Sequence, residues 1–93
     1  LSELTDFTRR VLRLKLARRY RLCADSYEDL ANAQEALGNR SSTKKLLQGS
    51  IKFYKLYQKS FTDDGKDQFG VDRINQSDFL IRIGKIQKRV DGS

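Results

Sequence analysis

The stretch from Thr5 to Leu37 most constrains the fold of this chain, because it contains neither Gly nor Pro and consists mainly of residues that favour helix. Its larger apolar residues recur at steps of three and four, with one step of seven, which places them on one face of a helix. These residues are Leu12, Leu16, Tyr20, Cys23, Tyr27, Leu30 and Leu37. The sequence therefore predicts a long amphipathic helix over residues 5–37 that buries this stripe, with Cys23 as a packing residue. Gly38 follows and suits the left-handed backbone at which many helices end.

A second apolar stripe lies on the same segment, rotated away from the first. It consists of Phe7, Val11, Leu14 and Leu22. A helix with two apolar stripes needs cover on more than one side. We therefore predict that these four residues contact another protein or a second copy of the chain, so that the domain forms a homo- or hetero-oligomer.

Charge is divided along this segment, with cations in its first half and acids from Asp25 onward. The helix macrodipole favours the opposite order, acids early and bases late. A break near Ala24 would remove the conflict, because Asp25 or Ser26 would then cap a new helix. The sequence leaves both forms open, one long helix or two shorter ones.

Two further helices are predicted after Gly38. The first covers residues 42–61, and its Gly49 either weakens the helix or lets a neighbouring helix approach closely. The second covers residues 76–90, and the Asp- and Gly-rich segment 62–75 between them is predicted to be a loop. Its apolar residues at helical spacing are Phe79, Leu80, Ile83, Ile86 and Val90. The chain is thus expected to be one all-α domain, a small antiparallel bundle of three helices, or of four if the first helix breaks.

Residues 24–57 resemble a single tetratricopeptide repeat, a pair of packed helices with large and small residues at set positions. The matching residues are Tyr27, Leu30, Ala31, Gly38, Thr43, Leu47 and Ser50. Gln34 stands where the repeat has an aromatic residue, Lys55 stands where it has Pro, and no second repeat follows. The resemblance implies a helical hairpin and a domain that binds peptides.

The usual residues of catalysis are missing. The chain has no His, one Cys and no Gly-rich phosphate loop, so we expect no enzyme activity, no cofactor and no metal. The run from Asp67 to Asp78 has the length of an EF-hand loop. However, Phe69 and Val71 stand where oxygen ligands are needed, and Asp78 replaces the bidentate Glu. The sequence therefore predicts no calcium site.

A net charge of +7 favours polyanions as partners, although a solvated helix surface explains the same charge. The candidate polyanion-binding residues are Arg9, Arg10, Arg13, Lys15, Arg18, Arg19 and Arg21. Arg suits phosphate because its guanidinium donates two parallel hydrogen bonds.

The function predicted first is therefore protein–protein interaction or assembly through helical faces. Nucleic-acid binding through the Arg-rich helix is the alternative, and association with an anionic membrane surface is the third possibility. The chain begins with Leu1 and contains no Met, so we expect a fragment of a larger protein. It shows no secretory signal, so we expect an intracellular one, in a compartment that the sequence does not specify.

Overall fold

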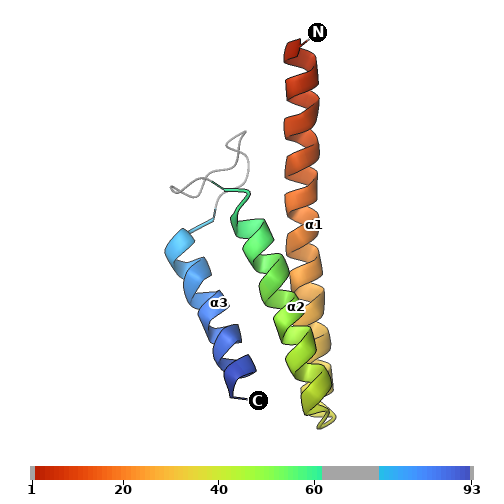
Figure 1. The fold of residues 1–93 in the computed structure, drawn as a ribbon, viewed down its shortest axis with the longest axis vertical. Coiled ribbons are helices and arrows are strands. Elements are labelled where there is room, and N and C mark those ends of the chain that lie inside the picture. The colour runs from red at the N-terminus through yellow and green to blue at the C-terminus, as the bar shows by residue number, and fades with distance from the viewer. Residues whose placement is uncertain (1, 62–73, 93) are drawn as a thin grey trace.

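The computed structural model describes residues 2–61 and 74–92, and that part of the chain forms three α-helices (Figure 1). Helix α1 spans Ser2–Ala36, α2 spans Arg40–Gln58 and α3 spans Gln76–Asp91. The predicted all-α class is confirmed. Because α1 continues through Ala24, the alternative of a break there is wrong. Residues 62–73 of the predicted loop, and with them most of the compared calcium loop, lie outside the described residues.

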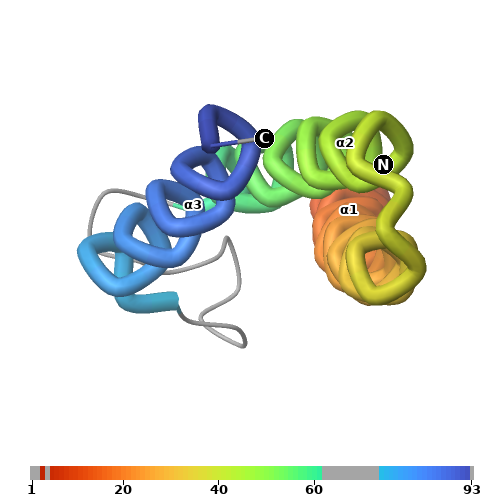
Figure 2. Tube along the Cα trace, turned by 90° about the horizontal axis from the view of Figure 1, so that it is seen from below, coloured from red at the N-terminus to blue at the C-terminus, as the bar shows by residue number. Residues whose placement is uncertain are grey.

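Helix α2 lies between the other two, and each helix runs antiparallel to the one before it (Figures 1 and 2). Helix α1 is much longer than α2, so its N-terminal part extends past the end of α2. Gly38, with φ of +79°, lies in the turn between α1 and α2, so helix α1 stops there as predicted. The start of α3 is capped by Asn75, whose side chain accepts a hydrogen bond of 3.1 Å from the amide of Asp78.

A seam of three alanines joins α1 to α2. Ala17, Ala24 and Ala31 are spaced by seven residues, which places them on one face of α1, and all three are buried. Opposite them, the buried hydroxyl of Ser50 on α2 donates a 2.9 Å hydrogen bond to the backbone carbonyl of Ala24. Gly49 lies beside the same contact, where an added Cβ would be 3.2 Å from the ring of Tyr27. Small residues on both helices thus allow the close approach predicted for Gly49.

The predicted burial of the large apolar stripe on α1 is wrong. Leu12, Leu16, Leu30 and Leu37 are between 47% and 72% exposed, and Cys23 is exposed as well. The physical reason is that α2 packs against the alanine seam, which lies to one side of the leucines on the helix. Periodicity found the large apolar residues, but helix contact is closest where residues are small.

The remaining core lies between α2 and α3. Its buried apolar residues are Leu47, Ile51, Tyr54, Tyr57, Phe61, Phe79, Ile83, Ile86 and Val90. Tyr54 and Tyr57 both pack against Phe79, with ring centroids 5.6 Å apart in each pair. Leu80 is exposed, so four of the five predicted apolar positions on α3 are buried. The aromatic residues therefore fix α3 on α2.

A larger side chain in the alanine seam should strongly lower the free energy of unfolding. Ala24→Leu should lower the free energy of unfolding by about 3 kcal/mol, because the leucine separates α1 from α2 and breaks the hydrogen bond from Ser50. Ala33→Leu places the same side chain at an exposed position of α1 and should change stability by less than about 0.5 kcal/mol. Urea unfolding followed by circular dichroism measures both variants. Equal stabilities would contradict the importance of the seam.

Candidate functional site

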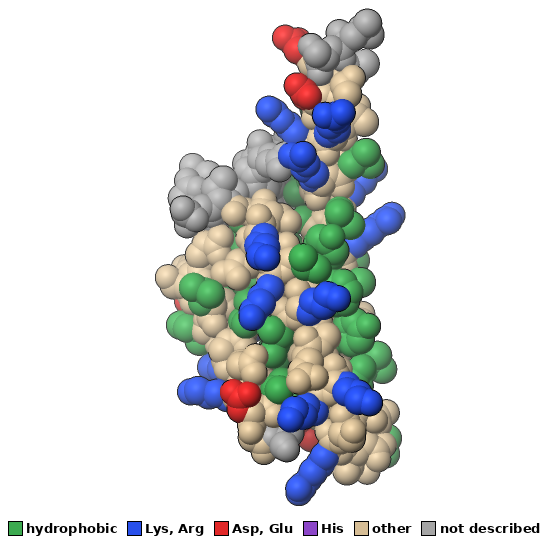
Figure 3. Space-filling view, in the orientation of Figure 1, with side chains coloured by type: hydrophobic (Ala, Val, Ile, Leu, Met, Phe, Trp, Pro, Cys, Tyr) green, Lys and Arg blue, Asp and Glu red, His purple; other side chains and the backbone are tan. Residues whose placement is uncertain are grey.

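The leucines left uncovered by α2 form an extended apolar surface on α1. We call it the apolar ridge, and it consists of Leu12, Leu16, Tyr20, Cys23, Tyr27, Leu30 and Leu37 of α1 together with Phe53 of α2. Hydrophobic side chains run along α1 in the space-filling view (Figure 3). An extended exposed apolar surface is typical of sites where proteins bind one another.

Three half-buried aromatic rings hold the ridge against α2. Phe53 stacks on Tyr27, with ring centroids 5.6 Å apart and an interplanar angle of 13°. On its other side Phe53 meets Tyr20 at a centroid distance of 6.1 Å. The rings therefore form a floor that is shared by both helices, and the exposed leucines stand beside it on α1.

Cations follow the α2 edge of the ridge and the N-terminal half of its α1 edge. On α1, Lys15 precedes Leu16 and Arg19 precedes Tyr20, and both cations are exposed. Because one residue turns a helix by about 100°, each cation lies beside its apolar neighbour, on the side away from α2. The matching edge on α2 consists of Lys45, Lys52 and Lys59, which are exposed and spaced by seven residues. Lys and Arg accordingly stand beside the hydrophobic side chains in Figure 3.

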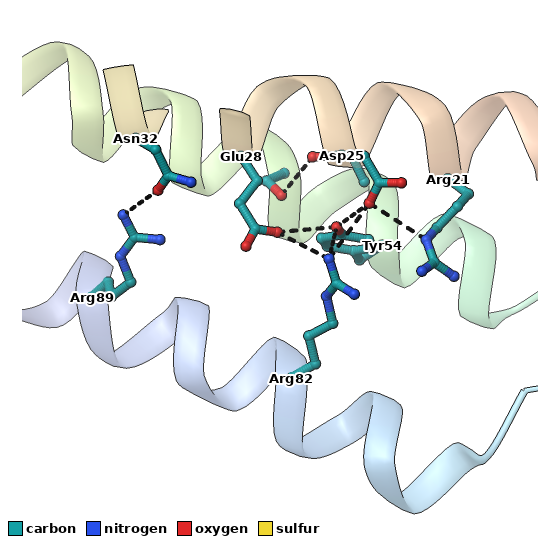
Figure 4. Close-up of polar contacts among 9 residues, drawn as sticks. Arg21, Asp25, Glu28, Asn32, Tyr54, Arg82 and Arg89 are labelled. Atoms are coloured by element: carbon teal, nitrogen blue, oxygen red, sulfur yellow. Dashed lines mark hydrogen bonds and ion pairs between the residues drawn. The ribbon is translucent and has the colours of Figure 1, made fainter. Parts of the chain in front are cut away.

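Asp25, Glu28 and Glu35 of α1 lie on its opposite flank, where they contact α3, and Figure 4 shows the first two. Arg82 of α3 donates to the hydroxyl of Tyr54 at 2.7 Å and lies 3.4 Å from a carboxylate oxygen of Glu28. The Tyr54 hydroxyl in turn donates to Asp25. Further along α3, Arg89 donates to Asn32 at 2.8 Å and to Glu35 at 2.9 Å. Long arginines thus connect α3 to α1 across the side of α2.

This cluster keeps Tyr54 protonated and Arg82 charged. Burial and the hydrogen bond to Asp25 raise the pKa of Tyr54 well above its ordinary value. Burial works to lower the pKa of Arg82, but the neighbouring Tyr54, Glu28 and Asp25 outweigh it, and the net shift is upward. Each group therefore remains in the form that its hydrogen bonds require, which is typical of a structural contact.

The predicted interface residues on α1 differ in their degree of burial. Phe7 and Leu22 are exposed, whereas Val11 and Leu14 are half-buried. Leu14 lines a pocket of about 220 Å³ at the place where α1 continues past α2. The exposed leucines of the ridge were predicted to be core, so sequence reasoning missed them as an interface. The alanines at steps of seven were the signal that would have identified the covered face.

The predicted polyanion-binding residues also differ in how exposed they are. Arg9, Arg10, Arg13, Lys15, Arg18 and Arg19 are exposed and are distributed around the circumference of α1. Arg21 is different, because its guanidinium carbon lies 5.4 to 5.9 Å from the ring centroids of Tyr54, Tyr57 and Phe79. It also forms an ion pair of 3.4 Å with Asp25, so its charge is already matched within the fold.

The structure brings two of these arginines together with a lysine of the following helix, which lies outside the predicted set. Arg10 and Arg13 line the same pocket as Lys59 at the end of α2. Within residues 2–61 and 74–92 no group of three His, Cys, Asp or Glu side chains is placed to hold a metal. None of the described helices is long and apolar enough to cross a membrane.

Known proteins offer no guide to this surface. No protein-family model, no curated protein and no solved structure matches the chain. What the chain does is therefore inferred from its own side chains, above all from the ridge and the cations beside it.

Removing the hydroxyl of Tyr54 should destabilise the fold while leaving the residues of the apolar ridge unchanged. Tyr54→Phe should lower the free energy of unfolding by about 1–2 kcal/mol, because Asp25 and Arg82 each lose a hydrogen-bond partner. Tyr27→Phe is the matched control. It removes a hydroxyl from a half-buried ring of α1 that packs on Phe53, away from the Tyr54 cluster. Urea unfolding measures both, and an unchanged Tyr54→Phe variant would contradict the role of the cluster.

The raised pKa of Tyr54 adds a pH dependence. A group whose pKa is higher in the folded state contributes stability below its unfolded pKa and loses it as the pH rises through the folded pKa. The stability difference between the native chain and Tyr54→Phe should therefore shrink above about pH 10, the ordinary pKa of tyrosine.

Proposed function

We propose that this domain is a docking module, which binds a helical segment of another protein along the apolar ridge. The observation that carries the proposal is the exposure of Leu12, Leu16, Leu30 and Leu37, because folding leaves all four leucines between 47% and 72% exposed to water. They occupy one flank of a rigid helix, so a partner helix can cover them together.

The size of the ridge sets the expected affinity. Burying a leucine fully contributes about 1.5–3 kcal/mol, so covering four half-exposed leucines contributes on the order of 4 kcal/mol. That amount only offsets the cost of association, which is about 4 kcal/mol or more. The net affinity must therefore come from the aromatic floor and from the cations at the edges. This balance favours a reversible complex over a permanent one.

A designed peptide tests the docking function directly. A helical peptide of about 25 residues, with Leu on one face and Gln elsewhere, should shift the backbone amide NMR signals of ridge residues. Leu16→Ser combined with Leu30→Ser should weaken its binding by about tenfold or more, because both removed side chains belong to the ridge.

The matched control removes equal apolar surface elsewhere. Leu80 and Ile81 on α3 are as exposed as the ridge leucines, so Leu80→Ser combined with Ile81→Ser should leave binding unchanged. Shifts that map to α3, or an equal loss in both double variants, would contradict the docking function at the ridge.

Nucleic-acid binding is the second candidate, and one specific observation favours it. Arg10, Arg13 and Lys59 come from two helices yet line one pocket. Helix α2, which leads away from this pocket, carries five cations and no Asp or Glu, the cations being Arg40, Lys44, Lys45, Lys52 and Lys55. A run of cations without acids is what a phosphate backbone attracts.

Salt dependence tests this second candidate. If Arg10, Arg13 and Lys59 contact three phosphates of duplex DNA, affinity should fall roughly 40-fold between about 50 and 200 mM salt. Replacing all three with Gln should remove most of that salt dependence, whereas Lys85→Gln combined with Lys88→Gln on α3 should not. Fluorescence anisotropy of a labelled duplex gives both values, and equal effects of the two variants would contradict a site at the pocket.

A further inference from the structure

We propose that the partner which docks on the ridge is an acidic amphipathic helix, with an apolar face on the leucines and carboxylates toward the cations at both edges. This inference rests on the docking function proposed above and specifies the chemistry of the partner. It follows from three features of the described residues: the charge of the side chains along the edges, the location of the acids of α1, and the length of the ridge.

The α2 edge of the ridge and the N-terminal half of its α1 edge carry positive charge, whereas the exposed acid Asp29 precedes Leu30 further along the α1 edge. Lys15 and Arg19 border the ridge on α1, and Lys45, Lys52 and Lys59 border it on α2. A spacing of seven residues keeps the three lysines in line along the helix. A partner helix with Asp or Glu on both sides of its apolar face therefore meets opposite charge along the α2 edge and beside Lys15 and Arg19.

Three acids in the C-terminal half of α1 face away from this surface. Asp25 and Glu28 contact Arg82, and Glu35 contacts Arg89, all on the flank that packs toward α3. A second copy of the chain that docked ridge to ridge would bring cations against cations. Like charges across an interface are unfavourable, so charge complementarity selects an acidic partner over a second copy.

The length of the ridge sets the length of the partner. From Leu12 to Leu37 a helix rises by about 37 Å, which corresponds to roughly seven turns in the partner. Along α2, Lys45 and Lys59 lie about 21 Å apart by the same rise per residue. The partner is thus expected to present carboxylates at steps of about seven residues beside its apolar face.

A bilayer surface fits this arrangement less well than a helix. A helix that lies on a membrane gathers its apolar residues on one side. On α1, by contrast, exposed apolar residues occur on two flanks, with Leu16 and Leu30 on one and Leu22 on the other. The aromatic floor between α1 and α2 also offers a partner helix a surface made by both helices.

Three peptides that share one Leu face test the inference. Their remaining positions carry Glu, Gln or Lys, and the ridge should bind the Glu peptide about tenfold more tightly than the Gln peptide at about 50 mM salt. This preference should fall to about twofold near 500 mM salt, because salt screens charges at exposed edges. The Lys peptide should bind most weakly.

Charge reversal supplies the decisive variant. Lys45→Glu, Lys52→Glu and Lys59→Glu together should make the domain prefer the Lys peptide over the Glu peptide. Lys85→Glu with Lys88→Glu on α3 is the control and should keep the native preference. Circular dichroism confirms that each variant remains helical.

The other outcomes are distinguishable. Equal binding of the three peptides, lost in Leu16→Ser with Leu30→Ser, would overturn the acidic partner and leave the docking function intact. No binding of any peptide would overturn both. A dimer by light scattering that the same double variant dissolves would identify a second copy as the occupant and overturn the acidic partner. Ridge-dependent binding to phosphatidylserine vesicles, stronger than to the Glu peptide, would also overturn it.

Discussion

The hydrogen bond from Ser50 to the carbonyl of Ala24 marks the contact on which the rest of the structure depends. It forms because small residues on both helices allow α1 and α2 to approach closely. Once the alanine face of α1 is used in this way, the neighbouring leucine face has no partner within the described residues. The exposed ridge is therefore a direct consequence of how the core is built.

Helix α3 packs on α2 and reaches α1 through a few long side chains. Arg82 and Arg89 form ion pairs with α1, and the ring centroid of Phe79 lies 5.8 Å from the guanidinium carbon of Arg21. Arg82 and Arg89 pair with Asp25, Glu28 and Glu35 on one flank of α1. Lys15 and Arg19 lie on a different flank of the same helix, so the surface beside the proposed docking site differs in charge from the surface that holds α3.

Local signals in the sequence predicted the helices, because runs without Gly or Pro, caps and Gly38 act within a few residues. The covered face of α1 could not be predicted in the same way, since two apolar faces competed and only the position of α2 decides between them. Cys23 and Arg21 show the difference: periodicity made the first a core residue and composition made the second a surface cation, yet the first is exposed and the second lies among three rings. The alanines at steps of seven held the missing information.

The length of α1 links the ridge to helix stability. Beside Tyr20 and Tyr27 the ridge is supported by Phe53, whereas Leu12 and Leu37 near its two ends are 59% and 72% exposed. A helix in a protein gains most of its stability from tertiary packing of an apolar face rather than from helix propensity. In the proposed complex, a partner helix that covers Leu12 and Leu16 packs against a flank of α1 that α2 leaves exposed. Docking along the complete ridge would therefore stabilise α1 itself as well as the complex.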